Sequence, residues 1–112
     1  MIFRHLFRRG ASIDVVEAAR RLEAGELLLV DVREKAEWRR GRAPHARHVP
    51  LSRLGRQIET LATQGTPIAF ICRSGHRSAV ACATARGHGV ETVDVRGGMA
   101  AWHRAGLPVT AG

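Results

Sequence analysis

The chain has 112 residues, 45% of them hydrophobic and 25% charged, and its formal net charge is +8. This length and composition exclude a disordered tail and fit one compact domain with its own core. Three Phe, two Trp and no Tyr argue against a stacking surface for single-stranded nucleic acid. No apolar run is long enough to span a membrane. We therefore expect neither a nucleic-acid partner nor a membrane span.

The two cysteines, Cys72 and Cys82, are ten residues apart, in no metal-ligand or Cys-x-x-Cys spacing. This favours free thiols in a reducing compartment and predicts no metal site and no cofactor. Residues 1–11 form a basic, amphipathic segment that lacks the apolar run of a signal peptide. We therefore predict a cytoplasmic protein with one folded domain at residues 12–110.

Short apolar runs alternate with stretches of helical periodicity, which predicts an α/β domain. Ser12 is either the N-cap of the first helix or the end of a short strand. That helix has its apolar stripe at Val15, Val16, Ala19 and Leu22 and ends at Gly25. Next we expect a strand at Leu27–Val30, a helix at Glu34–Arg40, a brief strand near Arg47–Val49 and a helix at Leu51–Thr63.

The second half continues the alternation. We expect a strand at Ile68–Ile71, a loop at Cys72–Arg77, a helix at Ser78–Arg86, a strand at Glu91–Val95, a turn at Gly97-Gly98 and a helix at Met99–Arg104. Uninterrupted apolar strands are typical of a parallel sheet that is covered on both faces. Ligands of such sheets bind at the carboxyl ends of the strands, where Asp31 and Cys72 fall.

Cys72 lies directly between a buried strand and a loop that leads into a helix. Backbone N–H groups of such a loop can form an anion site, and the helix N-terminus adds partial positive charge. Arg73, His76 and Arg77 add cationic side chains, and Gly75 allows a tight turn. These surroundings favour a nucleophilic thiolate. Its target could be the outer sulfur of thiosulfate, a phosphate ester or arsenate.

The sequence resembles the rhodanese domain over about residues 12–110. The matching motifs are Asp31-Val32-Arg33-Glu34, Glu37-Trp38, Gly41–Ala46, His48-Val49-Pro50, Cys72-Arg73-Ser74-Gly75-His76-Arg77-Ser78, Gly97-Gly98, Trp102 and Gly106-Leu107-Pro108. Several separated motifs agree in order and spacing, so the resemblance is specific. It departs from the family at Arg42, where a histidine is common, and at His45, where a glycine is common. These two departures put the local loop shape in doubt more than the chemistry.

The resemblance implies a three-layer α/β/α fold with a five-stranded parallel sheet in the order 3-2-4-5-1. It also implies a thiosulfate sulfurtransferase, in which Cys72 takes the outer sulfur, releases sulfite and holds a persulfide. Cyanide or a thiol then removes the sulfur, and thioredoxin and glutathione are candidate cellular acceptors. Four residues separate Cys72 from Arg77, the shorter loop of the sulfur-transferring members. A Cys-dependent phosphatase or arsenate reductase and a non-enzymatic binding module remain alternatives.

We expect the backbone N–H groups of Arg73–Arg77 to hold the persulfide. Arg77 would brace the loop, whereas Arg73 and His76 bind the substrate anion or are surface residues. Ser78 caps the helix or directs its hydroxyl to the sulfur, and capping is the favoured interpretation. We expect the remaining candidate residues to have supporting or packing roles. They are Asp31 and Arg33 in ion pairs that could include Glu37, Gly97 and Gly98 in a turn at the pocket rim, Trp38 and Trp102 in packing, Ser74 in the loop, and Cys82 in the core.

Overall fold

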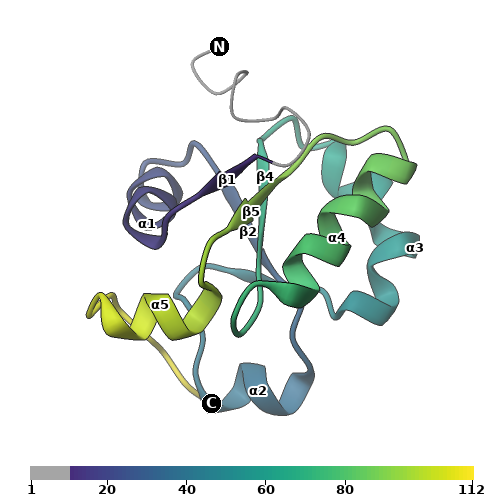
Figure 1. The fold of residues 1–112 in the computed structure, drawn as a ribbon. Helices are drawn as coiled ribbons and strands as arrows, with labels where there is room; N and C mark the ends of the chain where they lie inside the picture. Colours follow the sequence, from purple (N-terminus) through teal and green to yellow (C-terminus); the bar gives the residue numbers. More distant parts are fainter. Residues whose placement is uncertain (1–10) are drawn as a thin grey trace.

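Five short strands form a parallel sheet in the order β1-β5-β4-β2-β3, as expected (Figure 1). The computed structural model describes residues 11–112, so the expectation for the basic segment lies outside them except at Ala11. The strands are β1 (Ser12–Ile13), β2 (Leu28–Asp31), β3 (Arg47–His48), β4 (Ile68–Ile71) and β5 (Val93–Val95). No helix within residues 11–112 is long and apolar enough to cross a membrane.

Helices cover both faces of the sheet, which gives the α/β/α arrangement. They are α1 (Val15–Glu23), α2 (Lys35–Arg40), α3 (Leu51–Ala62), α4 (His76–Gly87) and α5 (Gly98–Arg104). In Figure 1, α1 and α5 lie on one side of the sheet and α3 and α4 on the other. The short α2 lies beyond the carboxyl ends of the strands, near the loop that follows β4. This arrangement leaves that end of the sheet for the site.

The alternation of side chains along β4 builds two separate cores. Ala69 and Ile71 pack with the α1 and α5 side, whereas Ile68 and Phe70 pack with the α3 and α4 side. Cys72 continues this alternation one residue beyond the strand, so its side chain lies on the α4 side and is buried. The position of the cysteine therefore follows from the register of the central strand.

Some boundaries differ from the sequence expectations. The N-cap of α1 is Asp14, whose Oδ1 accepts from Glu17 N–H at 2.8 Å, and Ser12 belongs to β1. The last strand begins at Val93. α4 begins at His76 because Gly75, with φ of 117°, closes the loop early. A left-handed residue at that point lets the helix start two residues before Ser78.

His45, one of the two departures from the family pattern, still adopts the backbone conformation that the family's glycine would have. Within residues 11–112 it is the non-glycine residue with a positive φ, at 69°. The family commonly has glycine there, which adopts this conformation without a steric penalty. The loop between α2 and β3 therefore keeps a left-handed turn although its side chain is a histidine.

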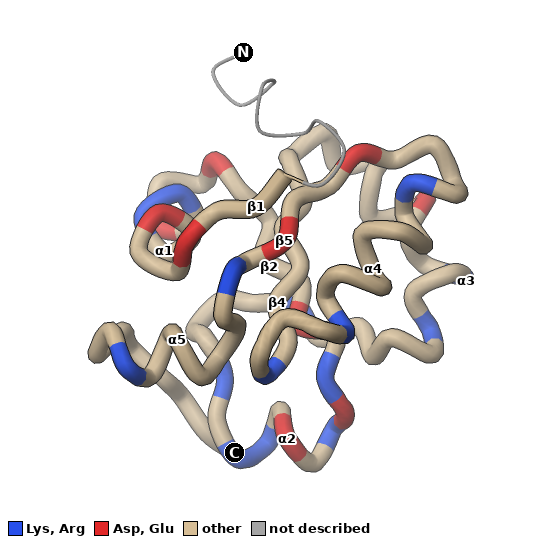
Figure 2. The backbone as a smooth tube through the Cα atoms, in the orientation of Figure 1, with Lys and Arg blue, Asp and Glu red and all other residues tan. Residues whose placement is uncertain are grey.

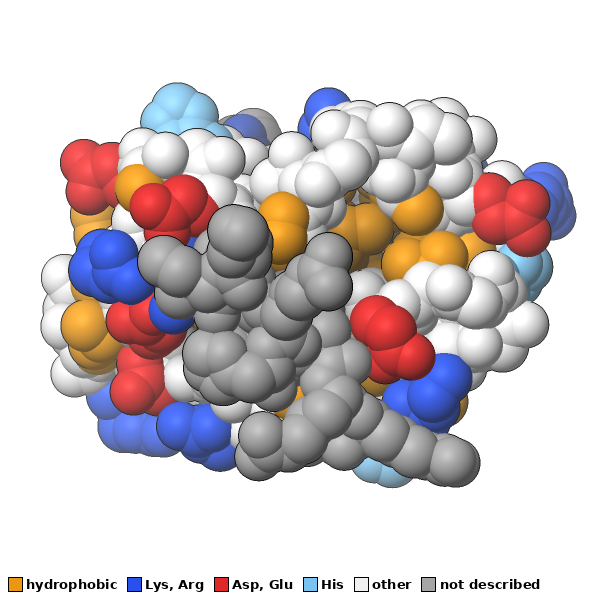
Figure 3. Space-filling view, turned by 90° about the horizontal axis from the view of Figure 1, so that it is seen from above, with side chains coloured by type: hydrophobic (Ala, Val, Ile, Leu, Met, Phe, Trp, Pro, Cys, Tyr) orange, Lys and Arg blue, Asp and Glu red, His pale blue; other side chains and the backbone are white. Residues whose placement is uncertain are grey.

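The two ends of the sheet differ in character. Basic positions of α2, α5 and the loop after β4 gather around the carboxyl ends of the strands (Figure 2). The opposite end, seen from above in Figure 3, shows hydrophobic side chains in a hollow. A cavity of about 210 Å³ at the start of β4 is lined there by Ala62, Pro67, Ile68 and Val90, among others. The anion-attracting end is therefore the one that carries Cys72.

The N-terminus of α5 is docked on the backbone of the loop after β4. Met99 N–H donates to the carbonyl of Cys72 at 2.8 Å, and Ala100 N–H donates to the carbonyl of Arg73 at 2.9 Å. Gly98 makes this approach possible because its φ is 55° and a Cβ there would lie 2.4 Å from the Cys72 oxygen. The Cβ would meet a backbone atom, which cannot move aside as a flexible side chain could.

We expect Gly98→Ala to destabilise the protein by about 3 kcal/mol, from a left-handed alanine and a backbone clash together. Chemical denaturation measures this loss. Gly55→Ala is the matched control, because Gly55 is exposed on α3 and a Cβ there meets nothing within 4 Å. That variant should be neutral or more stable by about 0.5–1 kcal/mol. Equal stability of the two variants would contradict the docking argument.

Candidate active site

The Cys72 sulfur is enclosed by the loop that follows β4. The residue is 1% exposed. Gly75 N–H donates to Sγ at 3.1 Å and Ser78 N–H donates to it at 3.3 Å. The left-handed turn at Gly75 folds the chain back over the sulfur and points these amides at it. Two backbone donors on one sulfur stabilise a negative charge there.

The start of α4 adds to this electrostatic environment. His76 and Arg77 lie in its first turn, where backbone N–H groups have no carbonyl partner within the helix. The positive end of the helix dipole therefore faces the loop. From the sequence we expect the backbone N–H groups of Arg73–Arg77 to hold the persulfide. In the structure, the N–H groups that donate to Sγ are those of Gly75 and Ser78. The donor at Ser78 lies one residue beyond the expected range.

Ser78 is not the helix cap, which corrects the favoured interpretation. The N-cap is Gly75, and Ser78 lies inside α4 and is buried. Its Oγ is 3.5 Å from Cys72 Sγ and 3.2 Å from the carbonyl oxygen of Gly75, and it donates to Asp94 Oδ1. Asp94 is not among the site residues expected from the sequence. Its signal was an acidic residue between the apolar residues of a buried strand.

Arg77 forms a two-point ion pair with Glu37 of α2. Arg77 Nη1 and Nη2 lie 2.7 Å and 2.9 Å from the two carboxylate oxygens. The Arg77 hydrogen bonds, helped by the Glu34 N–H group, lower the pKa of Glu37 to about 2. Glu37 raises the pKa of Arg77 in return. From the sequence we expect Glu37 to join the ion pairs of Asp31 and Arg33, whereas in the structure it pairs with Arg77 and connects α2 to α4.

Asp31 and Arg33 form their own buried pair at the end of β2. Arg33 Nη2 lies 2.8 Å from Asp31 Oδ2, and Arg33 Nε is shared between both oxygens of that carboxylate. Arg33 also donates to the carbonyl of Gly41 at 2.7 Å. These bonds fix the turn between β2 and α2. Both residues therefore shape the wall of the site.

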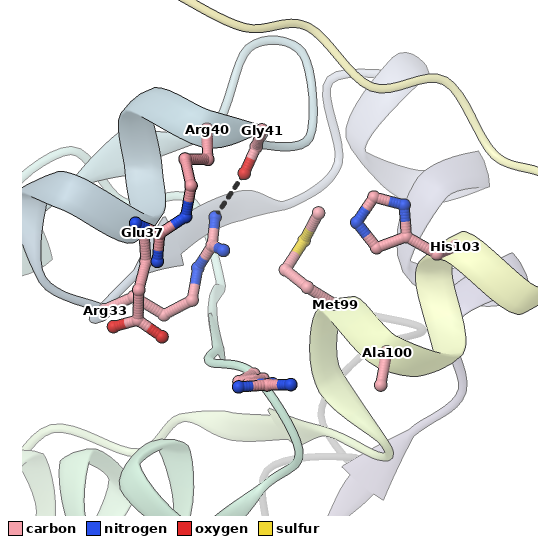
Figure 4. A pocket seen from close by; sticks show the side chains of 8 residues that line it. Arg33, Glu37, Arg40, Gly41, Met99, Ala100 and His103 are labelled. Atoms are coloured by element: carbon pink, nitrogen blue, oxygen red, sulfur yellow. Dashed lines mark hydrogen bonds between the residues drawn. The ribbon is translucent and has the colours of Figure 1, made fainter.

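A cavity of about 360 Å³ opens next to the loop. Its lining is Arg33, Glu37, Arg40, Gly41, Arg73, Met99, Ala100 and His103. Figure 4 shows Arg33, Glu37 and Arg40 on one side and Met99 and His103 across from them. Arg33 is held by Asp31, and Glu37 by Arg77. Arg40 and His103 are cavity residues that the sequence analysis did not single out.

The remaining candidates fall around this centre. Ser74 and His76 are exposed and do not line the cavity. Gly97 is the left-handed N-cap of α5, next to Gly98 at the loop. Cys82 lies on α4, half-buried against the core, and burial raises the pKa of its thiol. Trp102 is buried, and Trp38 stacks on His48 with ring centroids 4.8 Å apart. A buried thiol with a raised pKa stays protonated at neutral pH, so Cys82 is a packing residue and not a nucleophile.

We expect Glu37→Gln to destabilise the protein by about 1 kcal/mol at pH 7. A carboxylate whose folded pKa is depressed contributes stability above its ordinary value of 4.5 and loses it toward pH 2. The difference between wild type and the variant should therefore shrink as pH falls from 4.5 to 2. Urea unfolding at several pH values measures it. Glu23→Gln, at an exposed position of α1, should show no such pH dependence.

Comparison with known proteins identifies the family of this chain. Residues 14–105 match the Rhodanese-like domain family. YtwF from Bacillus subtilis is 43% identical over 77 residues, covering 69% of this chain and 74% of its own. A protein named sulfurtransferase from Allochromatium vinosum is 35% identical over 102 residues, covering 88% and 94%. The thiosulfate sulfurtransferase GlpE from Vibrio cholerae is 33% identical over 100 residues, covering 88% and 93%.

Solved structures agree as well. The crystal structure of a rhodanese-related protein from Thermoplasma volcanium is 30% identical, with a TM-score of 0.79 and coverage of 90% of this chain and 98% of that one. Named relatives of similar length thus support sulfurtransferase chemistry in general. With its sheet order, its Cys72 loop and this family match, the chain belongs to the rhodanese-like domain family.

Proposed function

We propose that this protein is a thiosulfate sulfurtransferase that carries sulfur as a persulfide on Cys72. The observation that carries the proposal is the buried Cys72 Sγ, which two backbone N–H groups of a short loop approach at 3.1 Å and 3.3 Å. This environment stabilises negative charge on sulfur in both the thiolate and the persulfide. The name of the Vibrio cholerae relative supports thiosulfate as the donor.

The reaction has two steps of nucleophilic displacement at sulfur. The Cys72 thiolate attacks the outer sulfur of thiosulfate, the S–S bond of thiosulfate breaks, and sulfite leaves with the bonding electron pair. Cyanide or a thiolate then attacks the outer sulfur of the Cys72 persulfide. Thiocyanate or a new persulfide leaves, and the Cys72 thiolate is restored. No redox partner is needed because each step exchanges one bond to divalent sulfur for another.

The size of the loop supports sulfur over phosphorus chemistry. Four residues separate Cys72 from Arg77. Arg77 is engaged by Glu37 through both terminal nitrogens, so it is not free to clamp a phosphate. A small ring of N–H groups suits one sulfur atom better than a tetrahedral oxyanion. Phosphatase or arsenate reductase activity is therefore the less favoured alternative.

The basic cavity supports an anionic donor and gives an acceptor its entrance. Arg40, Arg73 and His103 line it and can attract a sulfonate or carboxylate group. Its volume of about 360 Å³ exceeds what cyanide alone requires. A thiol such as glutathione, or the active site of thioredoxin, is therefore a suitable acceptor. Cys72 and Cys82 are both free, which suits our proposal of a reducing, cytoplasmic location.

Incubation with thiosulfate should add the mass of one sulfur atom to the intact protein, and cyanide should discharge it as thiocyanate. Intact-protein mass spectrometry and a colorimetric thiocyanate assay measure the two events. Cys72→Ser should abolish the mass gain. Cys82→Ser is the matched control and should retain it, because Cys82 is a packing residue.

A folded protein with reduced Cys72 that gains no mass would overturn thiosulfate as donor. The same sample would then be tested with arsenate and an aryl phosphate. Turnover of either would establish the phosphatase or arsenate reductase alternative. Inactivity with all three would favour the binding-module alternative.

Arg73→Gln should lower kcat/KM for thiosulfate about tenfold, mostly through KM, because one charge-assisted contact to the anion is lost. Arg73 is exposed and lines the cavity, so the fold should not change. Arg53→Gln removes the same charge from the exposed surface of α3 and should leave kcat/KM unchanged. Equal losses in both variants would mean that Arg73 acts only through net charge.

A further inference from the structure

The Ser78 hydroxyl has one hydrogen to donate but several possible hydrogen-bond acceptors around it. Its Oγ is near the Gly75 carbonyl oxygen at 3.2 Å, and it donates to Asp94 Oδ1 in a short hydrogen bond. Cys72 Sγ lies 3.5 Å away on the third side. A hydroxyl has a single hydrogen, and both oxygens can only accept it. The bond to the carboxylate is shorter and charge-assisted, so that oxygen holds the hydrogen.

We propose that Asp94 is a positioning residue that controls the ionisation of Cys72 through the Ser78 hydroxyl. With its hydrogen held by Asp94, Ser78 presents a lone pair to Sγ. It therefore accepts a hydrogen bond from the Cys72 thiol and cannot donate one to the thiolate. This proposal rests on the proposed function only for the role of Cys72 as sulfur carrier.

Two opposing sets of groups thus act on the same sulfur. The amides of Gly75 and Ser78 favour the thiolate, whereas the Ser78 oxygen and the Asp94 charge behind it favour the thiol. Asp94 and Ser78 therefore oppose the stabilisation of the thiolate that the two amides provide, and removing the Asp94 charge should change the pH dependence of Cys72 reactivity.

The fold leaves Asp94 no other side-chain hydrogen-bond partner within residues 11–112. It is the middle residue of β5, between two buried valines, and its backbone is in register with Phe70 of β4 and Ser12 of β1. Phe70 offers no polar group, and Ser12 Oγ accepts from Arg96 Nη1 and forms no hydrogen bond with Asp94. The half-buried carboxylate is thus directed to Ser78.

Other titratable and charged groups also lie near Cys72 and Asp94. Arg77 of α4 pairs with Glu37 of α2, which is the main cause of its raised pKa, and the nearby Cys72 adds to that rise. Cys82, one turn after Ser78 on α4, faces Asp94, and both burial and that carboxylate raise the pKa of its thiol. Arg86 lies further along the same helix and lowers the pKa of the Cys82 thiol.

Arg73 and His76 are exposed, in the loop after β4 and in the first turn of α4. The Asp94→Asn change leaves all of these groups in place.

The test is the pH dependence of Cys72 alkylation by iodoacetamide, followed by peptide mass spectrometry that separates Cys72 from Cys82. Asp94→Asn should move the midpoint of the Cys72 profile down by about one pH unit. Below the midpoint, alkylation should be about tenfold faster. The amide is isosteric, removes the charge and can donate to Ser78 Oγ, which frees the hydroxyl hydrogen for the thiolate. Glu91→Gln, at an exposed position just before β5, should leave the midpoint unchanged.

Ser78→Ala distinguishes action through the hydroxyl from a direct effect of charge. In the Ser78→Ala background, Asp94→Asn should move the midpoint by less than half as much. An unchanged or higher midpoint for Asp94→Asn would overturn the proposal. So would an equal shift with and without the Ser78 hydroxyl. Alkylation needs no sulfur donor, so the result stands even if thiosulfate proves not to be a substrate, and thermal unfolding verifies that each variant is folded.

Discussion

The site depends on two hydrogen bonds that hold the back of the loop after β4. The amides of Met99 and Ala100, at the start of α5, bind the carbonyl groups of Cys72 and Arg73. Carbonyls that point toward α5 leave the amides of the loop free to turn toward the sulfur. Gly98 is required for this contact because a side chain there would collide with the Cys72 carbonyl. The cysteine environment is therefore a property of two elements that are distant in the chain.

Close packing of α4 on the sheet provides the other half of the environment. The residues of α4 that face the sheet are small: Ser78, Ala81 and Ala85 are buried. Small side chains let the helix approach the strands closely. The Ser78 hydroxyl can therefore reach both the end of β4 and the middle of β5. A larger residue there would separate Cys72 from Asp94.

Two of the arginines near the Cys72 sulfur are paired with carboxylates, whereas Arg73 is exposed at the cavity. Arg33 and Arg77 are paired with Asp31 and Glu37, so they shape the walls and connect α2 to its neighbours. Arg73 is exposed and lines the cavity beside them. An incoming anion therefore first meets the exposed charge of Arg73, which pairs with no carboxylate within residues 11–112, and then the carboxylate-paired arginines deeper inside. Such a gradient suits the proposed donor, thiosulfate, which would bind, release sulfite and leave room for an acceptor.

Local patterns in the sequence determined the apolar strands, the helices between them and the placement of Cys72 at a strand–loop–helix junction. These features depend on residues within one or two turns of each other, where periodicity and backbone preference decide the outcome. The sheet order came from the resemblance to the rhodanese domain and agrees with the structure. Only the tertiary structure decided that Ser78 serves Asp94 rather than the helix end, and that Glu37 pairs with Arg77 forty residues away. Such contacts join side chains from different elements, and their geometry is set by how helices pack on the sheet, which no local pattern records.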